Sequence, residues 1–411
     1  MVNDKDLLTY DYKKDFPILM AKDVAYLDNS ATTQKPLCVI EAERDFYLKH
    51  NANPLRGLYE LAMEATDAYE DARIAVQKFI NAKTEQEIIF TRNASESLNL
   101  VAYTYGLANL HEGDEIVTTI MEHHSNMLPW RMVAEKTGAT LKYIECEADG
   151  TVTDAAIEAA ITEKTKLVAM AEVSNVLGRL NPIAKLISEA HKVGAVAVID
   201  AAQSAPHMSV DVQKMDADFL AFSGHKMLGP MGIGVLYGKK ELLEAMPPFL
   251  RGGEMISFVS RDGQEYAPLP HKFEAGTVNA AGAVGLHAAI DYISSIGFEV
   301  IEAREAALTK LAFDAMQKIE GVHIIGGKTA EEHKGILTFT VDGVHPHDIA
   351  AILDADGVNI RAGNHCAQPL LDHLCTGATA RASIAFYNTQ EDVERFIKSL
   401  STIRERMGYG R

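Results

Sequence analysis

The chain has few cysteines and lacks any long hydrophobic run. Cysteine occurs four times in 411 residues, at Cys38, Cys146, Cys366 and Cys375, without a C-x-x-C pair. This usage excludes a disulfide-stapled secreted scaffold and predicts a reducing compartment. No stretch approaches the roughly 18 apolar residues of a membrane span, and the opening residues lack the apolar core of a signal peptide. The sequence therefore predicts a cytoplasmic protein with no membrane partner.

Positive charge is also scarce. The 39 Lys and Arg residues stand against 57 Asp and Glu, which gives a formal net charge of −18. A chain of this charge without a basic patch repels phosphate backbones, so we expect no nucleic-acid partner. Glycine and proline are near ordinary levels, which excludes a fibrous or low-complexity chain. The length predicts two or three domains.

The middle of the chain alternates short β-branched runs with longer helical stretches. The runs are mostly apolar and lie at 87–91, 114–120, 166–173, 195–200, 218–223 and 232–238. Strands that are apolar on both faces are typical of a parallel sheet covered by helices. We therefore expect an α/β large domain with a mainly parallel sheet at residues 25–295. Within it, the polar, Gly-containing and Pro-containing residues 250–280 predict a long functional loop or arm.

The pattern changes after about residue 296. A helical stretch at 298–319 is followed by three separated strand candidates, which predicts a smaller α+β C-terminal domain at 296–411. Residues 1–24 are expected to form an N-terminal extension that packs on this small domain.

Two reactive side chains follow successive candidate strands. The run DFLAFS leads into Lys226, and AVAVID ends in Asp200. Ligands bind at the carboxyl edge of open α/β sheets, where a desolvated lysine can form a Schiff base. A buried carboxylate needs a partner, and the protonated ring nitrogen of pyridoxal phosphate is one. Alone, each residue could be a surface lysine or a helix cap, but together they favour this cofactor.

A phosphate site would complete such a centre. After the strand EIIFT, the segment RNASES places Ser95 at an expected helix N-terminus, where free N–H groups and the helix dipole favour an anion. Ser223 and His225 would converge on it from the loop that carries Lys226. A plain capping role for Ser95 is almost equally compatible with the spacing.

Two histidines and a cysteine are further candidates. His123 and His124 follow the strand DEIVTTI, where an imidazole could stack on a planar ring or move protons. No third ligand has the spacing of a metal site, so we predict no metal. Cys366 lies beside His365 in the polar loop RAGNHCAQPL, a setting typical of a nucleophilic thiol; the other three cysteines are interpreted as structural.

Arginines flank that loop. Arg361 lies five positions before Cys366, and Arg381 begins the strand ARASIAF. A bidentate arginine could clamp a substrate carboxylate, although a surface salt bridge would fit the spacing of Arg381 equally well.

Eight segments together resemble the group II cysteine desulfurases of the SUF iron–sulfur assembly type. They run from residue 26 to 388 in the family's order: YLDNSATTQKP, MEHHSNMLPW, VSNVLGRLNPI, VIDAAQSAPH, FSGHKMLGPMGIGVLYG, KFEAGTVN, RAGNHCAQPL and ARASIAFYNT. The resemblance implies a class V aminotransferase fold whose large domain binds pyridoxal phosphate, and a homodimer. It also implies conversion of L-cysteine to L-alanine, with the sulfur kept as a persulfide.

The resemblance further implies a role for each matching residue. Lys226 would bind the cofactor covalently and remove the Cα proton, and Cys366 would attack the substrate sulfur. Around the cofactor ring it implies Asp200 at the ring nitrogen, Gln203 at the phenolic oxygen, Asn175 near that oxygen and the substrate carboxylate, and His123 stacked on the ring. At the phosphate it implies Ser95, Ser223, His225 and, across the dimer, Thr277. Arg381, with Arg361, would hold the substrate carboxylate.

The chain also departs from the family's pattern. Leu55 and Asn364 stand where many relatives have histidine, which bears on substrate tuning and acceptor choice, and RNASES replaces a phosphate turn rich in Gly and Thr. His347 matches a histidine that, in relatives with a zinc-bearing U-type sulfur acceptor, helps to exchange a zinc ligand. A simple helix-start role for this His-Pro-His turn is comparably compatible.

Two other classes of function remain open at this point. A selenocysteine lyase or a cysteine-sulfinate-cleaving enzyme would keep Lys226 and Asp200. A non-enzymatic scaffold could instead bind zinc through a Cys/His set made of His345, His347, His365 and Cys366.

Overall fold

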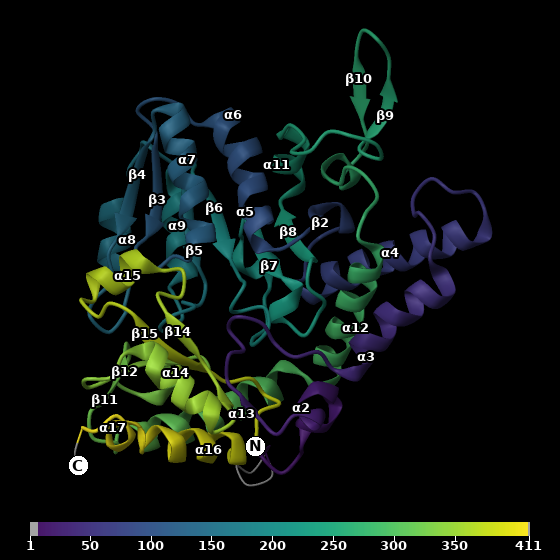
Figure 1. Cartoon of the computed structure of the whole chain (residues 1–411). Helices are drawn as coiled ribbons and strands as arrows, with labels where there is room; N and C mark the ends of the chain where they lie inside the picture. The colour runs from purple at the N-terminus through teal and green to yellow at the C-terminus, as the bar shows by residue number, and fades with distance from the viewer. Residues whose placement is uncertain (1–6, 410–411) are drawn as a thin grey trace.

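The computed structural model describes residues 7–409, and its largest sheet has seven strands (Figure 1). Their order across the sheet is β2 (Ile88–Thr91), β8 (Gly234–Gly238), β7 (Phe219–Ser223), β6 (Val196–Asp200), β5 (Thr165–Ala171), β3 (Glu115–Thr119) and β4 (Thr140–Ile144). Strand β8 runs antiparallel to both neighbours, whereas the other pairs are parallel. The expected mainly parallel sheet is confirmed.

Both faces of this sheet are buried, because its strands carry apolar residues at consecutive positions. On β5, Val168 and Met170 belong to a core shared with α3 (Leu37–Asp45), α4 (Glu60–Phe79) and α12 (Ala280–Ile296). Leu167 and Ala169 belong to a second core shared with α5 (Ala94–Val101) and α7 (Leu128–Thr137). Successive side chains of a strand point to opposite faces, so an unbroken apolar run requires helices on each side. The sheet is therefore the middle layer of an α/β sandwich.

The helices alternate with the strands along the chain. Those in the first half are α2 (Pro17–Ala21), α3 (Leu37–Asp45), α4 (Glu60–Phe79), α5 (Ala94–Val101), α6 (Leu107–Asn109), α7 (Leu128–Thr137), α8 (Asp154–Ala160) and α9 (Ile183–Lys192). Those in the second half are α10 (Val212–Met215), α11 (Lys240–Ala245), α12 (Ala280–Ile296), α13 (Phe298–Met316), α14 (Pro346–Ala355), α15 (Gln368–His373), α16 (Gln390–Leu400) and α17 (Ile403–Arg406).

The C-terminal part has its own antiparallel sheet. Its strands are ordered β11 (Val322–Ile325), β12 (Ile336–Val341), β15 (Thr379–Ser383) and β14 (Arg361–Gly363). The predicted strands after residue 320 correspond to β11, β12 and β15. A separate core lies between this sheet and helices α13, α14 and α16, which gives the α+β arrangement expected from the sequence.

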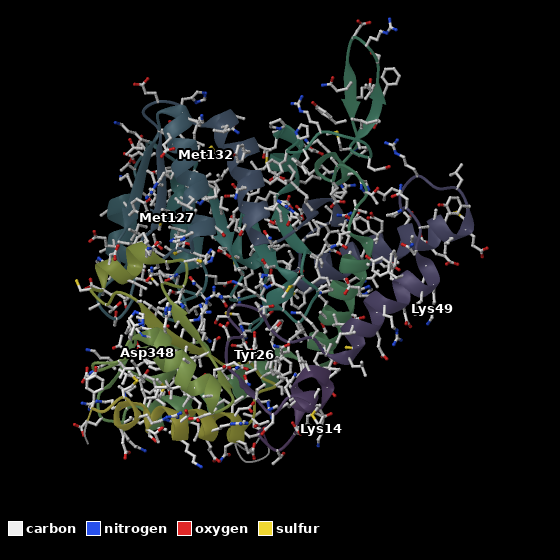
Figure 2. All side chains as sticks on the ribbon, in the orientation of Figure 1. Lys14, Tyr26, Lys49, Met127, Met132 and Asp348 are labelled. Atoms are coloured by element: carbon white, nitrogen blue, oxygen red, sulfur yellow. The ribbon has the colours of Figure 1, made fainter. Side chains whose placement is uncertain are left out.

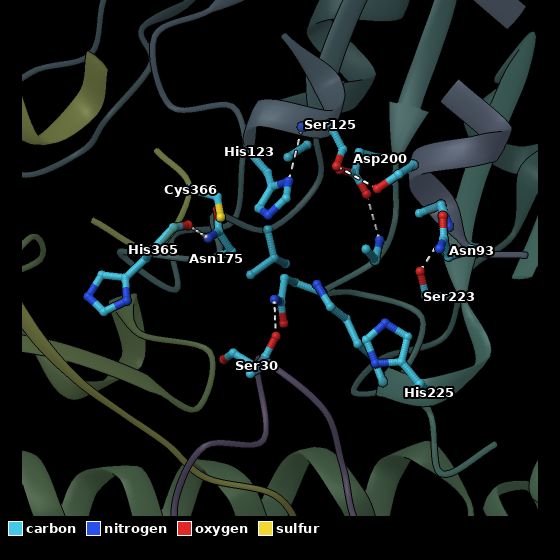
Figure 3. Close-up of a pocket in the computed structure, with 18 of the residues that line it drawn as sticks. Ser30, Asn93, His123, Ser125, Asn175, Asp200, Ser223, His225, His365 and Cys366 are labelled. Carbon is cyan, nitrogen blue, oxygen red and sulfur yellow. Dashed lines mark hydrogen bonds between the residues drawn. The ribbon is translucent and has the colours of Figure 1, made fainter. Parts of the chain in front are cut away.

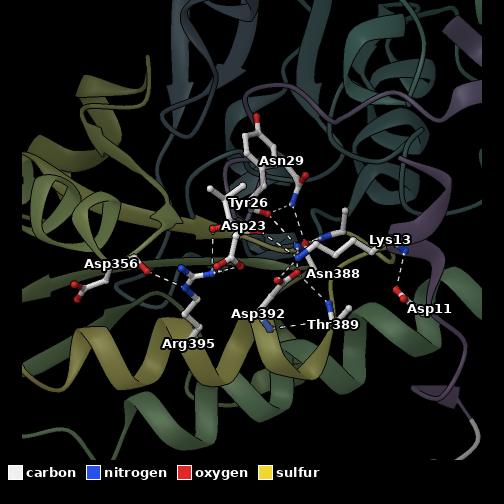
Figure 4. A network of polar contacts seen from close by, with 12 residues as sticks. Asp11, Lys13, Asp23, Tyr26, Asn29, Asp356, Asn388, Thr389, Asp392 and Arg395 are labelled. Carbon is white, nitrogen blue, oxygen red and sulfur yellow. Dashed lines mark hydrogen bonds and ion pairs between the residues drawn. The ribbon is translucent and has the colours of Figure 1, made fainter. Parts of the chain in front are cut away.

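The N-terminal segment is attached to this C-terminal part (Figure 4). Lys13 Nζ lies 2.7 Å from Asp392 Oδ1 on α16, and Arg395 Nη1 lies 2.9 Å from Asp23 Oδ1. Strand β1 (Ala25–Tyr26) pairs in parallel with β13 (Val358–Asn359). The first strand of the chain therefore hydrogen-bonds to the C-terminal part, although its residues were expected to begin the large domain.

A β-hairpin occupies part of the expected arm. Strands β9 (Ile256–Val259) and β10 (Gln264–Tyr266) are antiparallel, and the hairpin projects from the molecule. The sequence pattern missed both strands because most of their residues are exposed, so no alternation of buried and exposed positions marks them.

Side chains project into the region between the two main sheets (Figure 2), while Lys14 and Lys49 lie at the outer edge of the molecule. Within residues 7–409, no single helix is long and apolar enough to cross a membrane, although the bent pair α12 and α13 passes a test of length and composition.

Candidate active site

A cavity of about 200 Å³ lies between the carboxyl edge of the large sheet and the C-terminal sheet (Figure 3). It is lined by almost all of the site residues expected from the sequence: Ser95, His123, Asn175, Asp200, Gln203, Ser223, His225, Lys226, Arg361, Cys366 and Arg381. The remaining candidate, Thr277, is exposed and is not part of this lining. The fold therefore brings together residues from distant parts of one chain, from Ser95 to Arg381.

Lys226 is the last residue of the single 3-10 turn (Gly224–Lys226) that directly follows β7. The carbonyl oxygen of the preceding residue, His225, accepts hydrogen bonds from Thr32 Oγ1 at 3.0 Å and from Lys35 Nζ at 2.8 Å. These contacts fix the peptide that carries the lysine. Burial lowers the pKa of Lys226 to about 8, although the nearby Asp200 carboxylate acts in the opposite direction. A fraction of this amine is therefore neutral, and able to act as a nucleophile, near neutral pH.

Asp200 is the last residue of β6. In the sheet it is opposite Ala171 of β5 and Ala221 of β7, so its carboxylate lies at the centre of the carboxyl edge. Its Oδ1 accepts a hydrogen bond from the N–H of Ala202 at 2.9 Å. Burial raises the pKa of Asp200, and the Lys226 ammonium opposes this shift. A cationic group in the cavity would stabilise the ionised form.

His123 lies in the loop after β3. Its Nδ1 accepts a hydrogen bond from the N–H of Ser125 at 3.1 Å. Burial lowers the pKa of His123 to about 3, and the positive charge of Lys226 adds to the effect. The imidazole is therefore neutral at physiological pH and can stack on a planar ring.

Hydroxyl groups gather at the N-terminus of α5. Asn93 caps this helix by accepting a hydrogen bond from the N–H of Glu96 at 3.0 Å, Ser95 Oγ lies 2.6 Å from Ser125 Oγ, and Ser223 Oγ accepts from the N–H of Ala94 at 2.9 Å. Hydroxyls beside the positive end of a helix dipole suit an anion.

The close approach of β8 to this helix end depends on a glycine. A Cβ atom at Gly234 would lie 2.4 Å from the Cα of Asn93, so any side chain there would displace the backbone. The Gly-containing run after Lys226 therefore allows the α5 N-terminus to pack directly on the sheet.

The opposite wall of the cavity comes from the C-terminal part. Arg381 is buried on β15, and its Nη1 donates a hydrogen bond to the carbonyl oxygen of Asn175 at 2.8 Å, while its Nη2 lies 3.3 Å from Asp28 Oδ1. Burial lowers the pKa of Arg381 to about 10, which still leaves the guanidinium charged. Arg361 is exposed and lines the same cavity as the Cys366 thiol. Two positive side chains thus lie on the wall that presents the thiol.

The zinc-binding alternative does not match the structure. His345 and His347 lie 5.0 Å apart, measured between their ring centroids, at the start of α14. Across residues 7–409, however, no group of three or more His, Cys, Asp or Glu side chains is arranged to hold a metal ion. The four residues suggested as a zinc set therefore do not come together.

The structure adds residues to the cavity that were not singled out from the sequence. Ser30, Asn93 and Ser125 line it, and Ser30 and Ser125 lie inside the motifs YLDNSATTQKP and MEHHSNMLPW. Glu122, the residue before His123, is fully buried and does not line the cavity, but its carboxylate is hydrogen-bonded to Asn126 in the loop after β3. The motifs that contain these residues could have pointed to them, but a serine or a glutamate by itself predicts no site.

Comparisons with known proteins agree with this geometry. The model of the aminotransferase class-V family matches residues 25–396. A probable cysteine desulfurase from Halalkalibacterium halodurans is 50% identical over 97% of this chain and 99% of its own. The apo structure of a cysteine desulfurase from Thermococcus onnurineus NA1 superposes with a TM-score of 0.93 at 44% identity, covering 97% of this chain and 98% of the other.

A crystal structure of the cysteine desulfurase CsdA from Escherichia coli gives a TM-score of 0.90 at 39% identity, with 99% of both chains covered. These similarities extend over nearly the whole length of each chain, so they include both sheets and the cavity between them. The chain therefore belongs to the aminotransferase class-V family and, within it, to the cysteine desulfurases.

Proposed function

We propose that this cysteine desulfurase converts L-cysteine to L-alanine and keeps the sulfur as a persulfide on Cys366. The observation that carries the proposal is that the Cys366 thiol and the Lys226 amine line the same small cavity. The Lys226 amine, which could bind a carbonyl cofactor, and the Cys366 thiol, which could accept sulfur, would therefore both reach an amino acid bound in this cavity. The enzyme would act as a sulfurtransferase.

The cavity fits pyridoxal phosphate. Four buried polar atoms on its lining residues have no hydrogen-bond partner within residues 7–409: Ser30 Oγ, Gln203 Oε1, His365 Nδ1 and Arg381 Nε. Unpaired buried polar atoms are costly and suit a polar ligand. Lys226 would hold the cofactor, with Asp200 at its ring nitrogen and His123 on its ring, while Ser95, Ser223 and His225 would hold its phosphate. The bound cofactor would supply an electron sink for charge developing at the substrate Cα.

The side chains of this chain would then divide the proton and sulfur chemistry. Arg381 and Arg361 would hold the substrate carboxylate, and the Nζ of Lys226 would take the Cα proton. The Sγ of Cys366 would attack the substrate sulfur while the carbon–sulfur bond breaks, and the bonding pair would go to Cβ. Neutral His123 would relay the proton that completes the methyl group of alanine. The sulfur would remain on Cys366.

A second copy of the chain would complete the enzyme. Several large apolar side chains are more than one-third exposed, and they include Leu58, Tyr59, Leu61, Met63, Met231 and Phe258. Exposed apolar surface of this extent is typical of an interface. We infer a homodimer in which the exposed Thr277 reaches the partner's phosphate site. Sedimentation that finds a fully active monomer would contradict it.

The persulfide would pass to an acceptor protein of the SUF type. The imidazole of His347 is exposed at the start of α14, whereas His345 accepts a hydrogen bond from the N–H of residue 347 and caps the helix. His347 is therefore free to meet a zinc-bearing U-type acceptor. All four cysteines are free thiols, which suits a reducing cytoplasm.

The proposed function is tested by mass spectrometry after the enzyme is mixed with L-cysteine. The wild type should gain one sulfur on the peptide that contains Cys366. Cys366→Ser should keep the cofactor but lose alanine production, because a hydroxyl stays protonated where a thiol can ionise. The exposed Cys38 is an internal control. Undiminished alanine production by Cys366→Ser, or sulfur found on another cysteine, would contradict the proposal.

A further inference from the structure

The loop that carries Cys366 has an unusual backbone. His365 has a φ of 49° and Cys366 a φ of 55°, so two consecutive residues with side chains lie in the left-handed region. This conformation is unfavourable for L-residues, since Cβ approaches the following carbonyl oxygen. It persists only where surrounding contacts determine it, and such positions cluster at functional sites.

Two hydrogen bonds hold the carbonyl groups of the loop. The Nδ2 of Asn175 donates to the carbonyl oxygen of His365 at 2.8 Å, and the N–H of His124 donates to the carbonyl oxygen of Cys366 at 2.8 Å. Both donors belong to the large-sheet side of the cavity. The loop is therefore fixed in place against the wall that would hold the cofactor.

A third contact holds the His365 side chain on the opposite side. The imidazole points away from the Cys366 sulfur (Figure 3) and is only 5% exposed. Its Nε2 is hydrogen-bonded to Thr379 Oγ1 at 2.9 Å, whereas its Nδ1 has no partner within residues 7–409. Burial lowers the pKa of His365 to about 3, so the ring is neutral. Within residues 7–409, the Thr379 hydroxyl is the side chain that is hydrogen-bonded to this buried ring, and the backbone of Thr379 also lies beside the ring.

We propose that Thr379 is a positioning residue for the sulfur-accepting thiol: by anchoring the His365 ring, it keeps Cys366 in its left-handed loop and facing the cavity. The inference rests on the proposed function, in which Cys366 takes the sulfur. Thr379 does not line the cavity and is fully buried on β15. Its effect on the reaction therefore passes through His365. Without its hydroxyl, the buried ring would lose its side-chain hydrogen bond, and the loop would leave its conformation more often.

Two substitutions of similar size separate the hydroxyl from packing. Thr379→Val keeps the branched shape suited to a strand but removes the hydroxyl, whereas Thr379→Ser keeps the hydroxyl. The readout is the rate at which iodoacetamide alkylates Cys366 in the holoenzyme without cysteine, followed by mass spectrometry. We expect the rate to rise about three- to tenfold in Thr379→Val, in proportion to the loss of one hydrogen bond, and to stay at the wild-type value in Thr379→Ser.

Turnover should fall in Thr379→Val by a similar factor, while the absorbance of the bound cofactor should not change. His365→Phe removes the same bond from the ring side and should raise Cys366 alkylation equally, which keeps the test available if the valine variant does not fold. The alkylation rate of the exposed Cys38 should stay the same in all variants.

An unchanged Cys366 rate in both Thr379→Val and His365→Phe, or a serine variant that behaves like valine, would overturn the positioning role. Neither result would affect the proposed function, which depends on where the sulfur is found. Conversely, sulfur on another cysteine would contradict the proposed function even if the alkylation rates behaved as expected.

Discussion

The two walls of the cavity are built in different ways. On the large-sheet wall, Asp200 ends a central strand and Lys226 ends the short turn that follows the next strand, so regular structure places both side chains. On the C-terminal wall, Cys366 lies in a loop with a positive φ, held by contacts to residues far away in sequence. Strand ends thus position the groups that would bind the cofactor, and tertiary contacts alone position the thiol.

The charged groups of the two walls also differ. Burial moves the pKa values of Lys226 and Asp200 toward each other, because it disfavours an isolated charge of either sign. On the other wall, Arg381 keeps its charge and lies opposite the cofactor residues. The cavity therefore offers a titratable pair to the cofactor and a fixed positive charge to a carboxylate.

The largest expected effect comes from the large-sheet wall. Lys226→Ala should lower turnover by at least about a thousandfold and abolish covalent attachment of pyridoxal phosphate, since this amine is the lysine that lines the cavity. The measurement is borohydride reduction followed by mass spectrometry of the Lys226 peptide.

Lys272→Met is the matched control for Lys226→Ala. Burial lowers the pKa of Lys272 as well, but its Nζ donates to the carbonyl oxygens of Leu243 and Glu244 and does not line the cavity. Lys272→Met should keep the covalent attachment. Loss of covalent cofactor attachment in both variants would mean that the position of Lys226 near a strand end does not distinguish it from another buried lysine.

A smaller effect is expected on the C-terminal wall. Arg381→Lys keeps a positive charge but loses the planar fork, so KM for L-cysteine should rise about ten- to a hundredfold with a lesser change in kcat. Steady-state kinetics checks this. The same change at the exposed Arg361 should raise KM less. An unchanged KM in Arg381→Lys would remove this residue from substrate binding.

The sequence predicted the large-sheet wall better than the C-terminal wall, for a physical reason. An apolar run predicts a buried strand, and the residue that follows the run, such as Asp200 or Lys226, is then expected at the end of that strand. Both predictions depend only on neighbouring residues in the sequence. The bond between His365 and Thr379 and the pairing of β1 with β13 join distant segments, and no local pattern encodes them. Strand β4 was missed because it is an edge strand with mostly exposed or half-buried residues.

Glu122 allows a finer test of how the large-sheet wall is built. It precedes His123 in the chain and is fully buried, and its carboxylate accepts hydrogen bonds from Thr119 Oγ1 at 2.5 Å, Asn126 Nδ2 at 2.6 Å and the N–H of Ala171 at 2.9 Å. Through Ala171 it joins the His123 loop to the strand beside Asp200. Burial raises the pKa of Glu122 to about 8, and the negative charge of Asp200 adds to the effect.

A raised pKa makes stability depend on pH in a defined direction. Between the ordinary glutamate pKa and about 8, the folded state keeps a proton that the unfolded state releases, so this contribution to stability is present in acid and is lost as the pH rises. Glu122→Gln resembles the protonated acid: its oxygen can accept from Asn126 and Ala171, and its amide can donate to Thr119. The variant should fold and lack this pH dependence.

Between pH 5 and pH 8, the free energy of unfolding of Glu122→Gln should change with pH more positively than that of the wild type, by at most about 4 kcal/mol over the range, measured by urea unfolding of the cofactor-free protein. A slope should remain in the variant, because the pKa of Asp200 is raised and those of His123 and His365 are lowered. The control is Glu332→Gln: Arg179 lowers the pKa of Glu332 to about 2, so its contribution is constant above pH 5 and the slope should not change. Equal slopes in Glu122→Gln and wild type would mean that Glu122 is already ionised in the folded protein. The large-sheet wall would then hold two neighbouring negative charges, Glu122 and Asp200. The difference in charge between this wall and the positively charged C-terminal wall would therefore be larger.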